Sequence, residues 1–163
     1  MSTFVSGAVR PFAVQAGEGK VLPTPTDDTV TVKADTRQTN GSMTVLEFAF
    51  GPDQGPPQHA HLREDELWYV IEGEFRFQVG DAMLHATAGG MAFGPRGLPH
   101  AFQNVGTGPG RLLVVTTPSG LERFFEQTAE RALRWADADE FAAVGLANWL
   151  EFTGPPLRIS DPV

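Results

Sequence analysis

Residues 57–66 read PQHAHLREDE, and the interpretation of the whole chain depends on this stretch. It places His59 and His61 one residue apart and follows them with an acidic run, in a chain of four histidines. Side chains i and i+2 point to the same side of a strand, so both imidazoles can face one point if the segment is extended. Pro56 and Pro57 favour extended backbone here. A solvated polar loop is the competing interpretation.

The composition limits the classes of protein to consider. With 163 residues, of which 41% are hydrophobic and 20% charged, the chain is long enough for one domain with a core. A net charge of −8 without a Lys/Arg cluster argues against nucleic acid and anionic membranes as partners. Without cysteine, any metal must take nitrogen and oxygen ligands. No signal peptide or membrane-spanning run is visible, so we expect a cytoplasmic protein.

Outward from the histidines, apolar and polar residues alternate over short runs that are separated by glycine and proline, a pattern typical of half-buried strands. Eight such runs cover residues 29–34, 43–50, 67–71, 74–79, 82–86, 91–93, 100–105 and 111–117. Asn40-Gly41 and Gly80-Asp81 are hairpin signals. Because no helical crossover separates the runs, the strands should be antiparallel. The pattern predicts an all-β sandwich or small antiparallel β-barrel over residues 29–117.

The segments on either side of the strands differ from them. Residues 1–28 end near LPTPTDDT, whose prolines and aspartates favour irregular backbone, and we expect this segment to pack on the barrel. Residues 118–163 form a short helical C-terminal appendage, because the apolar spacing after the last strand becomes helical.

Two capping boxes predict where the helices of the appendage begin. Ser119 with Glu122 opens GLERFFEQTAERALRW, and Asp137 with Glu140 opens a second helix over residues 138–150. The remaining residues, EFTGPPLRISDPV, are predicted to be a proline-containing tail.

A third histidine and a carboxylate also lie where a turn meets a strand. His100 opens a run after GPRGLP, and Glu66 directly precedes the run LWYVI. Such junctions at one end of a small barrel can converge, and three imidazoles with one carboxylate suit a transition metal. Glu64 has the same strand parity as Glu66 and competes with it as the carboxylate ligand. His85 lies outside this pattern and is expected to pack or to face solvent.

The spacing of these residues resembles the two motifs of the cupin superfamily. HAHLREDELWYVIEG (59–73) fits the first motif: H-x-H, three or four residues, E, six residues, G. GGMAFGPRGLPHAFQN (89–104) fits the second: G, five residues, P-x-G, two residues, H, three residues, N. One departure is that Asp53 stands where a glycine usually opens the first motif.

The resemblance implies a jelly-roll β-barrel of six to eight strands with one divalent transition metal inside it. The ligands that it implies are His59, His61, Glu66 and His100, and the spacing to Gly73 favours Glu66 over Glu64. Fe, Mn, Ni, Co, Cu and Zn are all compatible with this ligand set. By the same resemblance we expect a homodimer.

The stretch VTTPSGLERFFEQ (115–127) is similar to that of bacterial quercetinase-like cupins, which are flavonol dioxygenases. This resemblance implies a metal-dependent dioxygenase that acts on a small aromatic or flavonol-like substrate. It also implies a catalytic role for Glu66 as the acceptor of a proton from the substrate hydroxyl. The alternatives are a non-catalytic cupin that binds a small ligand and a metal-dependent isomerase or hydrolase.

Aromatic residues near the predicted ligands suggest where a substrate would lie. Trp68 and Phe102 each follow a predicted ligand by two residues, so we expect both in the substrate pocket. The other large apolar residues of the strands are expected to be barrel core, namely Phe75, Phe77, Met83, Met91 and Phe93. The apolar faces of helices docked on the barrel are expected to include Phe124, Phe125, Phe141 and Trp149.

Overall fold

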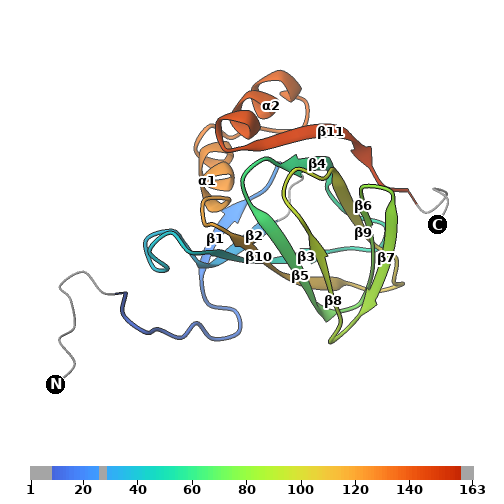
Figure 1. Ribbon diagram of the computed structural model, residues 1–163, viewed down its shortest axis with the longest axis horizontal. Helices are drawn as coiled ribbons and strands as arrows, with labels where there is room; N and C mark the ends of the chain where they lie inside the picture. The colour runs from blue at the N-terminus through green and yellow to red at the C-terminus, as the bar shows by residue number, and fades with distance from the viewer. Residues whose placement is uncertain (1–8, 26–28, 159–163) are drawn as a thin grey trace.

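Alternating apolar residues build two antiparallel β-sheets that face each other, with two short helices over one end of them (Figure 1). The structure is a computed structural model that describes residues 9–25 and 29–158. Its architecture is a jelly roll, which confirms the predicted all-β fold with a short helical C-terminal appendage.

The first sheet has six strands in the order β1-β2-β3-β10-β5-β8. These are β1 (Lys20–Pro23), β2 (Thr29–Ala34), β3 (Thr44–Phe50), β5 (Asp65–Glu72), β8 (Met91–Gly94) and β10 (Gly110–Thr117). The second sheet has five strands in the order β11-β4-β9-β6-β7. These are β4 (Pro57–His61), β6 (Glu74–Val79), β7 (Ala82–Thr87), β9 (His100–Asn104) and β11 (Leu150–Pro156).

The predicted strand runs all form strands, and the predicted hairpins join them. β2 and β3 pair as antiparallel neighbours, and the loop between them has positive φ at Asn40 and Gly41 (52° and 83°). Gly80-Asp81 connects β6 to β7. The segment of the first two histidines, predicted to be extended, is β4.

The core lies between the sheets and consists of residues on the inward faces of the strands. Its largest fully buried apolar side chains are Trp68, Phe75, Phe77, Leu46 and Leu112. Each such side chain contributes about 2–3 kcal/mol by leaving water. Phe75 and Phe77 therefore lie in the core as predicted.

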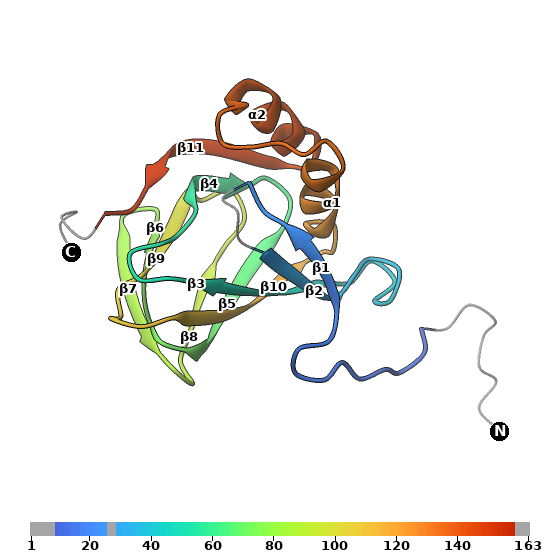
Figure 2. The same cartoon turned by 180° about the vertical axis from the view of Figure 1, so that it is seen from behind.

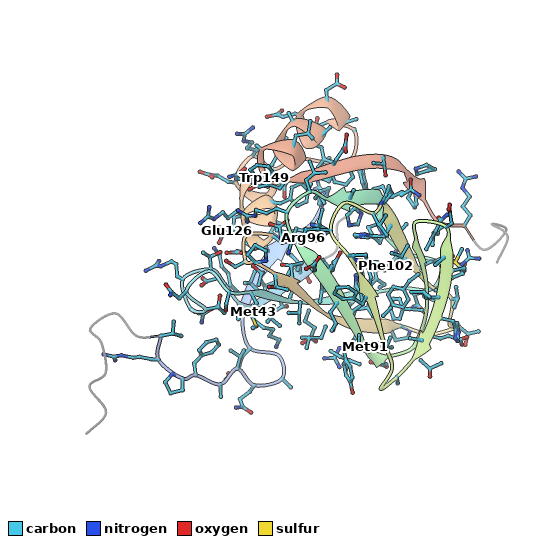
Figure 3. The ribbon with its side chains drawn as sticks, in the orientation of Figure 1. Met43, Met91, Arg96, Phe102, Glu126 and Trp149 are labelled. Atoms are coloured by element: carbon cyan, nitrogen blue, oxygen red, sulfur yellow. The ribbon has the colours of Figure 1, made fainter. Side chains whose placement is uncertain are left out.

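Met91 and Phe93 on the edge strand β8 were predicted to be barrel core, and this prediction is wrong. Met91 and Phe93 are 52% and 48% exposed, whereas Ala92 and Gly94 face inward. A Cβ at position 94 would lie 2.5 Å from the Trp68 ring, so only the smallest residue fits there. In Figure 3, Met91 lies at the outer edge of the barrel and Phe102 lies among the strands. Met83 on β7 is half-buried.

The two helices are shorter than predicted and neither begins with a capping box. Helix α1 spans Glu122–Glu130 and helix α2 spans Ala138–Ala147, and no side chain caps either N-terminus. Glu122 turns towards the barrel instead, where Thr36 and Thr44 donate hydrogen bonds to it. Trp149 follows α2 in a left-handed conformation (φ 62°) and is 52% exposed, so its assignment to a docked helix face is wrong.

The C-terminal segment that was predicted to be a tail forms β11, which runs along β4 (Figure 1). Leu150, Glu151 and Phe152 pair with β4, and an irregularity follows before Pro156. The proline signal was misleading because proline is tolerated on an edge strand. β11 thereby becomes the strand that covers the outer edge of β4.

The N-terminal segment is also partly regular, because β1 pairs with β2. Residues 9–18 precede β1 as irregular chain (Figures 1 and 2), and Lys33 of β2 donates hydrogen bonds to the carbonyl oxygens of Gln15 and Glu18. The segment expected to be irregular therefore contains one strand, β1, and for residues 1–8 and 26–28 the expectation lies outside the described residues. Neither of the described helices is long and apolar enough to cross a membrane.

Candidate metal centre

Strand β4 presents both of its histidines to the interior. His59 and His61 are 7% and 2% exposed, and their ring centroids lie 5.2 Å apart. His100 opens β9 directly opposite His59 in the antiparallel register, with a centroid separation of 4.5 Å. The two turn-to-strand junctions therefore converge, as the alternation of side chains along a strand predicts.

Glu66 completes the cluster from the facing sheet. Its Oε2 atom lies 3.0 Å from His61 Nε2 and 2.9 Å from His100 Nε2, and its side chain is buried. His59 Nε2 lies 3.2 Å from His100 Nε2. One ligand atom from each of the four residues lies within 4.8 Å of all the others.

These separations suit a bound metal as well as hydrogen bonds, and the unsatisfied atoms of the cluster favour the metal. Metal–ligand bonds of about 2.1 Å at right angles place neighbouring ligand atoms about 3 Å apart. Within the cluster, His61 Nε2 and Glu66 Oε2 are buried without a hydrogen bond of good geometry. Unsatisfied buried polar atoms are rare and call for an explanation. A buried set of three imidazoles and one carboxylate, consistent with one metal ion, supplies it.

Two of the imidazoles are fixed by backbone carbonyl groups on their outer side. Nδ1 of His59 lies 2.7 Å from the Pro57 carbonyl oxygen, and Nδ1 of His100 lies 3.1 Å from that of Leu98. An Nδ1–H that donates to a carbonyl leaves the lone pair on Nε2, which points into the cluster. Both rings are thus held in the tautomer that a metal ligand requires.

The electrostatics of the cluster favour a cation at its centre. Burial lowers the pKa of His59 to about 3, with further lowering from His100 and His61. Burial acts to lower the pKa of His61 and to raise that of Glu66. Their mutual attraction outweighs burial, so the pKa of His61 is raised and that of Glu66 is lowered from the ordinary values. An anionic Glu66 beside a neutral His59 is the charge state that binds a divalent ion.

Glu64, the competing carboxylate, lies on the other side of His61. Its Oε2 atom is 3.9 Å from His61 Nδ1, the ring nitrogen that faces away from the cluster. Glu64 therefore does not join the four converging ligand atoms. His85 lies on β7 and pairs with the exposed Glu74 at 2.6 Å, so it takes no part in the cluster.

A cavity of about 380 Å³ opens onto the cluster. His59, His61 and Glu66 form its polar end. Its remaining wall is mainly apolar and includes eight aromatic side chains from the barrel, from the helical region and from β11: Phe48, Phe50, Phe102, Phe124, Phe125, Trp135, Phe141 and Phe152. Of the two predicted pocket residues, Phe102 lines this cavity. Trp68 is fully buried behind His100, with ring centroids 5.0 Å apart, and is not part of the lining.

The wall that the helices supply was missed at the sequence level. Phe124 and Phe141 pack edge to face at 5.2 Å, and Phe152 of β11 lies 4.7 Å from Phe141. Helical periodicity predicted that Phe124 and Phe141 face inward, and it could not show that a cavity lies under them. The missing information was the position of β11, against which α2 packs.

Comparisons with solved structures place the fold among known ones. The chain is 36% identical to TT1209 from Thermus thermophilus, over 48% of this chain and 74% of that chain, with a TM-score of 0.46. KdgF from Halomonas sp. shares 15% identity over 67% of this chain and 94% of that chain, with a TM-score of 0.59. A predicted oxalate decarboxylase from Thermotoga maritima shares 19% identity over 66% and 99%, with a TM-score of 0.58. The last two show a shared fold.

The family assignment rests on the region that contains both motifs. A comparison with curated proteins finds no match. The cupin domain family model matches residues 46–116, which include the four residues of the buried cluster and most of both sheets. The fold, the two motifs and this match agree, and the chain belongs to the cupin superfamily.

Proposed function

We propose that this cupin is a metal-dependent dioxygenase that acts on a small, uncharged aromatic compound of the flavonol type. The observation that carries the proposal is the cavity, which joins a buried set of metal ligands to an aromatic wall. Its volume of about 380 Å³ is within the range of small-molecule sites. Aromatic walls favour flat, apolar ligands, because stacked and edge-to-face contacts add to the burial of apolar area.

The charge of the lining argues against an acidic substrate. Apart from the metal ligands, the polar side chains among the described lining residues are Asp53, Gln54, Thr24 and Thr29. No arginine or lysine is among those residues. A carboxylate substrate would therefore lack a cationic partner other than the metal, and burying it unpaired would be costly. A neutral phenol or enol meets no such penalty.

The residues of the chain have separable roles in this scheme. A redox-active metal in the cluster would supply the electron transfer that dioxygen chemistry requires. Glu66 is ionised, because its pKa is held below the ordinary value, and its carboxylate can accept the proton of a substrate hydroxyl. Phe102 and Phe125 exclude water and hold the substrate ring beside that carboxylate.

Dioxygen consumption tests the proposal. The metal-free protein is loaded separately with Fe(II), Mn(II), Co(II), Ni(II), Cu(II) or Zn(II), and each form is offered flavonols, catechols and β-diketones, with oxalate as an acidic comparison. We expect dioxygen uptake with at least one redox-active metal and a flavonol, and none with zinc or with oxalate. Phe125→Arg should block uptake by filling the cavity with charge, while Phe93→Arg on the outer surface serves as the matched control.

The outcomes separate the proposal from its alternatives. Turnover that proceeds without dioxygen would indicate a metal-dependent isomerase or hydrolase. Binding of flavonols without turnover, detected by quenching of Trp135 fluorescence, would indicate a ligand-binding protein. Either result overturns the dioxygenase assignment and leaves the metal centre intact.

A further inference from the structure

One of the three imidazoles in the cluster lacks the anchor that the other two have. Nδ1 of His59 and Nδ1 of His100 each lie within hydrogen-bonding distance of a backbone carbonyl oxygen two residues earlier. Nδ1 of His61 is buried and has no hydrogen-bond partner. Without a partner at Nδ1, neither the tautomer nor the orientation of this ring is fixed.

The nearest acceptor to this nitrogen is a second buried group without a partner. Glu64 is 1% exposed, and its Oε2 atom has no hydrogen bond. That oxygen lies 3.9 Å from His61 Nδ1. A displacement of less than about 1 Å in either side chain brings the two atoms to hydrogen-bonding distance. One hydrogen bond between the two atoms would satisfy both of these buried groups.

The other oxygen of Glu64 is held in place from the protein side. Arg63 donates to Glu64 Oε1 through Nε at 3.0 Å and through Nη2 at 2.9 Å. The same Nη2 donates to the Ser119 carbonyl oxygen at 2.7 Å, which ties the pair to the segment before α1. Gly120 permits this approach, since a Cβ there would collide with Arg63 Nη2. The carboxylate is thus fixed at one oxygen, with the other directed towards His61.

We propose that Glu64 is a positioning residue, which accepts a hydrogen bond from His61 Nδ1–H and holds the His61 Nε2 lone pair towards the metal. It does for His61 what the Pro57 and Leu98 carbonyl groups do for the other imidazoles. A carboxylate partner also makes the imidazole more basic, and so a stronger ligand than a carbonyl partner would. The inference rests on metal binding by the proposed function and is independent of its oxygen chemistry.

Metal affinity tests this role without any assay of activity. Co(II) is titrated into metal-free wild type, Glu64→Gln and Glu74→Gln in competition with a chelator, and the visible absorption of the bound ion is recorded. Loss of such a partner typically weakens metal binding about 10- to 100-fold. We expect a loss of at least about 10-fold for Glu64→Gln, with an altered Co(II) spectrum. Glu74→Gln removes a carboxylate from the exposed His85 pair and should match wild type.

A further variant separates positioning from a merely structural ion pair. Arg63→Met removes the ion pair and keeps the carboxylate. Positioning by Glu64 predicts a smaller loss of Co(II) affinity for Arg63→Met than for Glu64→Gln, because the carboxylate remains and only its anchor is lost, whereas a structural role predicts equal losses for both variants. Thermal unfolding of the metal-free forms reports any loss of folding separately. Wild-type affinity and spectrum in Glu64→Gln, or equal losses in the two variants, would overturn the inference. Failure of wild type to bind Co(II) would overturn the metal centre itself.

Discussion

Glu122 and Glu66 are both almost fully buried, yet their surroundings differ in how completely they are satisfied. Glu122 Oε1 accepts hydrogen bonds from the backbone N–H and the hydroxyl of Thr36, at 2.9 and 2.5 Å. Its Oε2 accepts from the Thr44 hydroxyl and from the Gly120 N–H. Glu66 Oε2, by contrast, is surrounded by imidazole nitrogens and has no hydrogen bond of good geometry.

The difference separates a structural cluster from the candidate metal centre. The Glu122 cluster is complete, because each oxygen has its donors, and it ties α1 to the loop after β2 and to β3. The cluster around Glu66 leaves buried polar atoms without hydrogen bonds. Such atoms destabilise the folded protein unless a metal ion binds them. Burial of a carboxylate alone does not indicate a metal site; the candidate site is marked by buried carboxylate and imidazole atoms that lack hydrogen bonds and converge on one point.

The largest expected effect is the loss of metal. Wild type purified without chelators should contain about one transition metal per chain. In the double variant His59→Ala/His61→Ala we expect almost none, because half of the ligands are gone. His85→Ala, which changes an exposed histidine, is the control. Elemental analysis by mass spectrometry measures the content, and unchanged metal in the double variant would falsify the assignment of the cluster.

A change in the complete cluster should act on stability and leave metal content alone. Glu122→Ala removes an acceptor of four hydrogen bonds and leaves buried donors unpaired. We expect a loss of about 2–4 kcal/mol in the free energy of unfolding. Chemical denaturation measures it, with the exposed Glu126→Ala on the same helix as control. A variant that folds normally and loses its metal would contradict the division between the clusters.

Metal should stabilise the protein through the incomplete cluster alone. At a free metal concentration of 100 times Kd, the expected gain is about 2.7 kcal/mol. A thermal scan with and without Co(II) should therefore show a rise in Tm for wild type and for Glu122→Gln, and none for His59→Ala/His61→Ala. Excess chelator should reverse the rise. An equal rise in all three proteins would show that the ion binds elsewhere.

The contribution of Glu122 should depend on pH. Burial raises the pKa of its carboxyl group, but the hydrogen bonds from Thr36 and Thr44 outweigh burial, and the pKa is lowered from the ordinary value of 4.5. A lowered folded-state pKa contributes stability that is present above pH 4.5 and is lost as the pH falls through the folded pKa. The difference in unfolding free energy between wild type and Glu122→Gln should therefore shrink below pH 4.5. A constant difference at every pH below that value would contradict this account.

The smallest expected effect concerns dimerisation. Association of two chains should change neither the metal content nor the hydrogen bonds of Glu122. The homodimer expected from the family resemblance stays a prediction. Tyr69 and Met91 pair across β5 and β8 and are both exposed, as is Phe93, so the outer face of these strands is a candidate contact. Sedimentation velocity of wild type and Phe93→Ser measures association, and metal content per chain should be the same in both. A monomeric wild type would contradict the homodimer.

Sequence spacing was enough to place the ligands, because strand alternation acts over two residues. His59 and His61 had to share a face once β4 was extended, and the turn before His100 set its register. The hydrogen-bond partners of individual side chains were harder to predict from the sequence. Glu122 fits a capping box by sequence, and it is tertiary contact with Thr36 and Thr44 that turns it inward.

The aromatic wall could not be predicted for a related reason. Its shape depends on where β11 lies, and Gly154 and two prolines made that segment look irregular. Phe152 could be recognised as part of the cavity only once its strand had been placed. Trp68 shows the opposite error: it shares a strand face with Glu66, but Gly94 lets it pack behind His100 instead of beside the cavity.

The pairing of β11 with β4 has a consequence for the order in which this protein folds. β4 pairs with its barrel neighbour β9 at a single position, and it pairs with β11 at four. Most backbone partners of the strand that carries His59 and His61 thus come from the far end of the chain. Contacts between distant segments close slowly, because the entropy of the intervening loop must be lost first. We therefore expect metal capture to be a late event, one that follows formation of the barrel and awaits the arrival of the last strand.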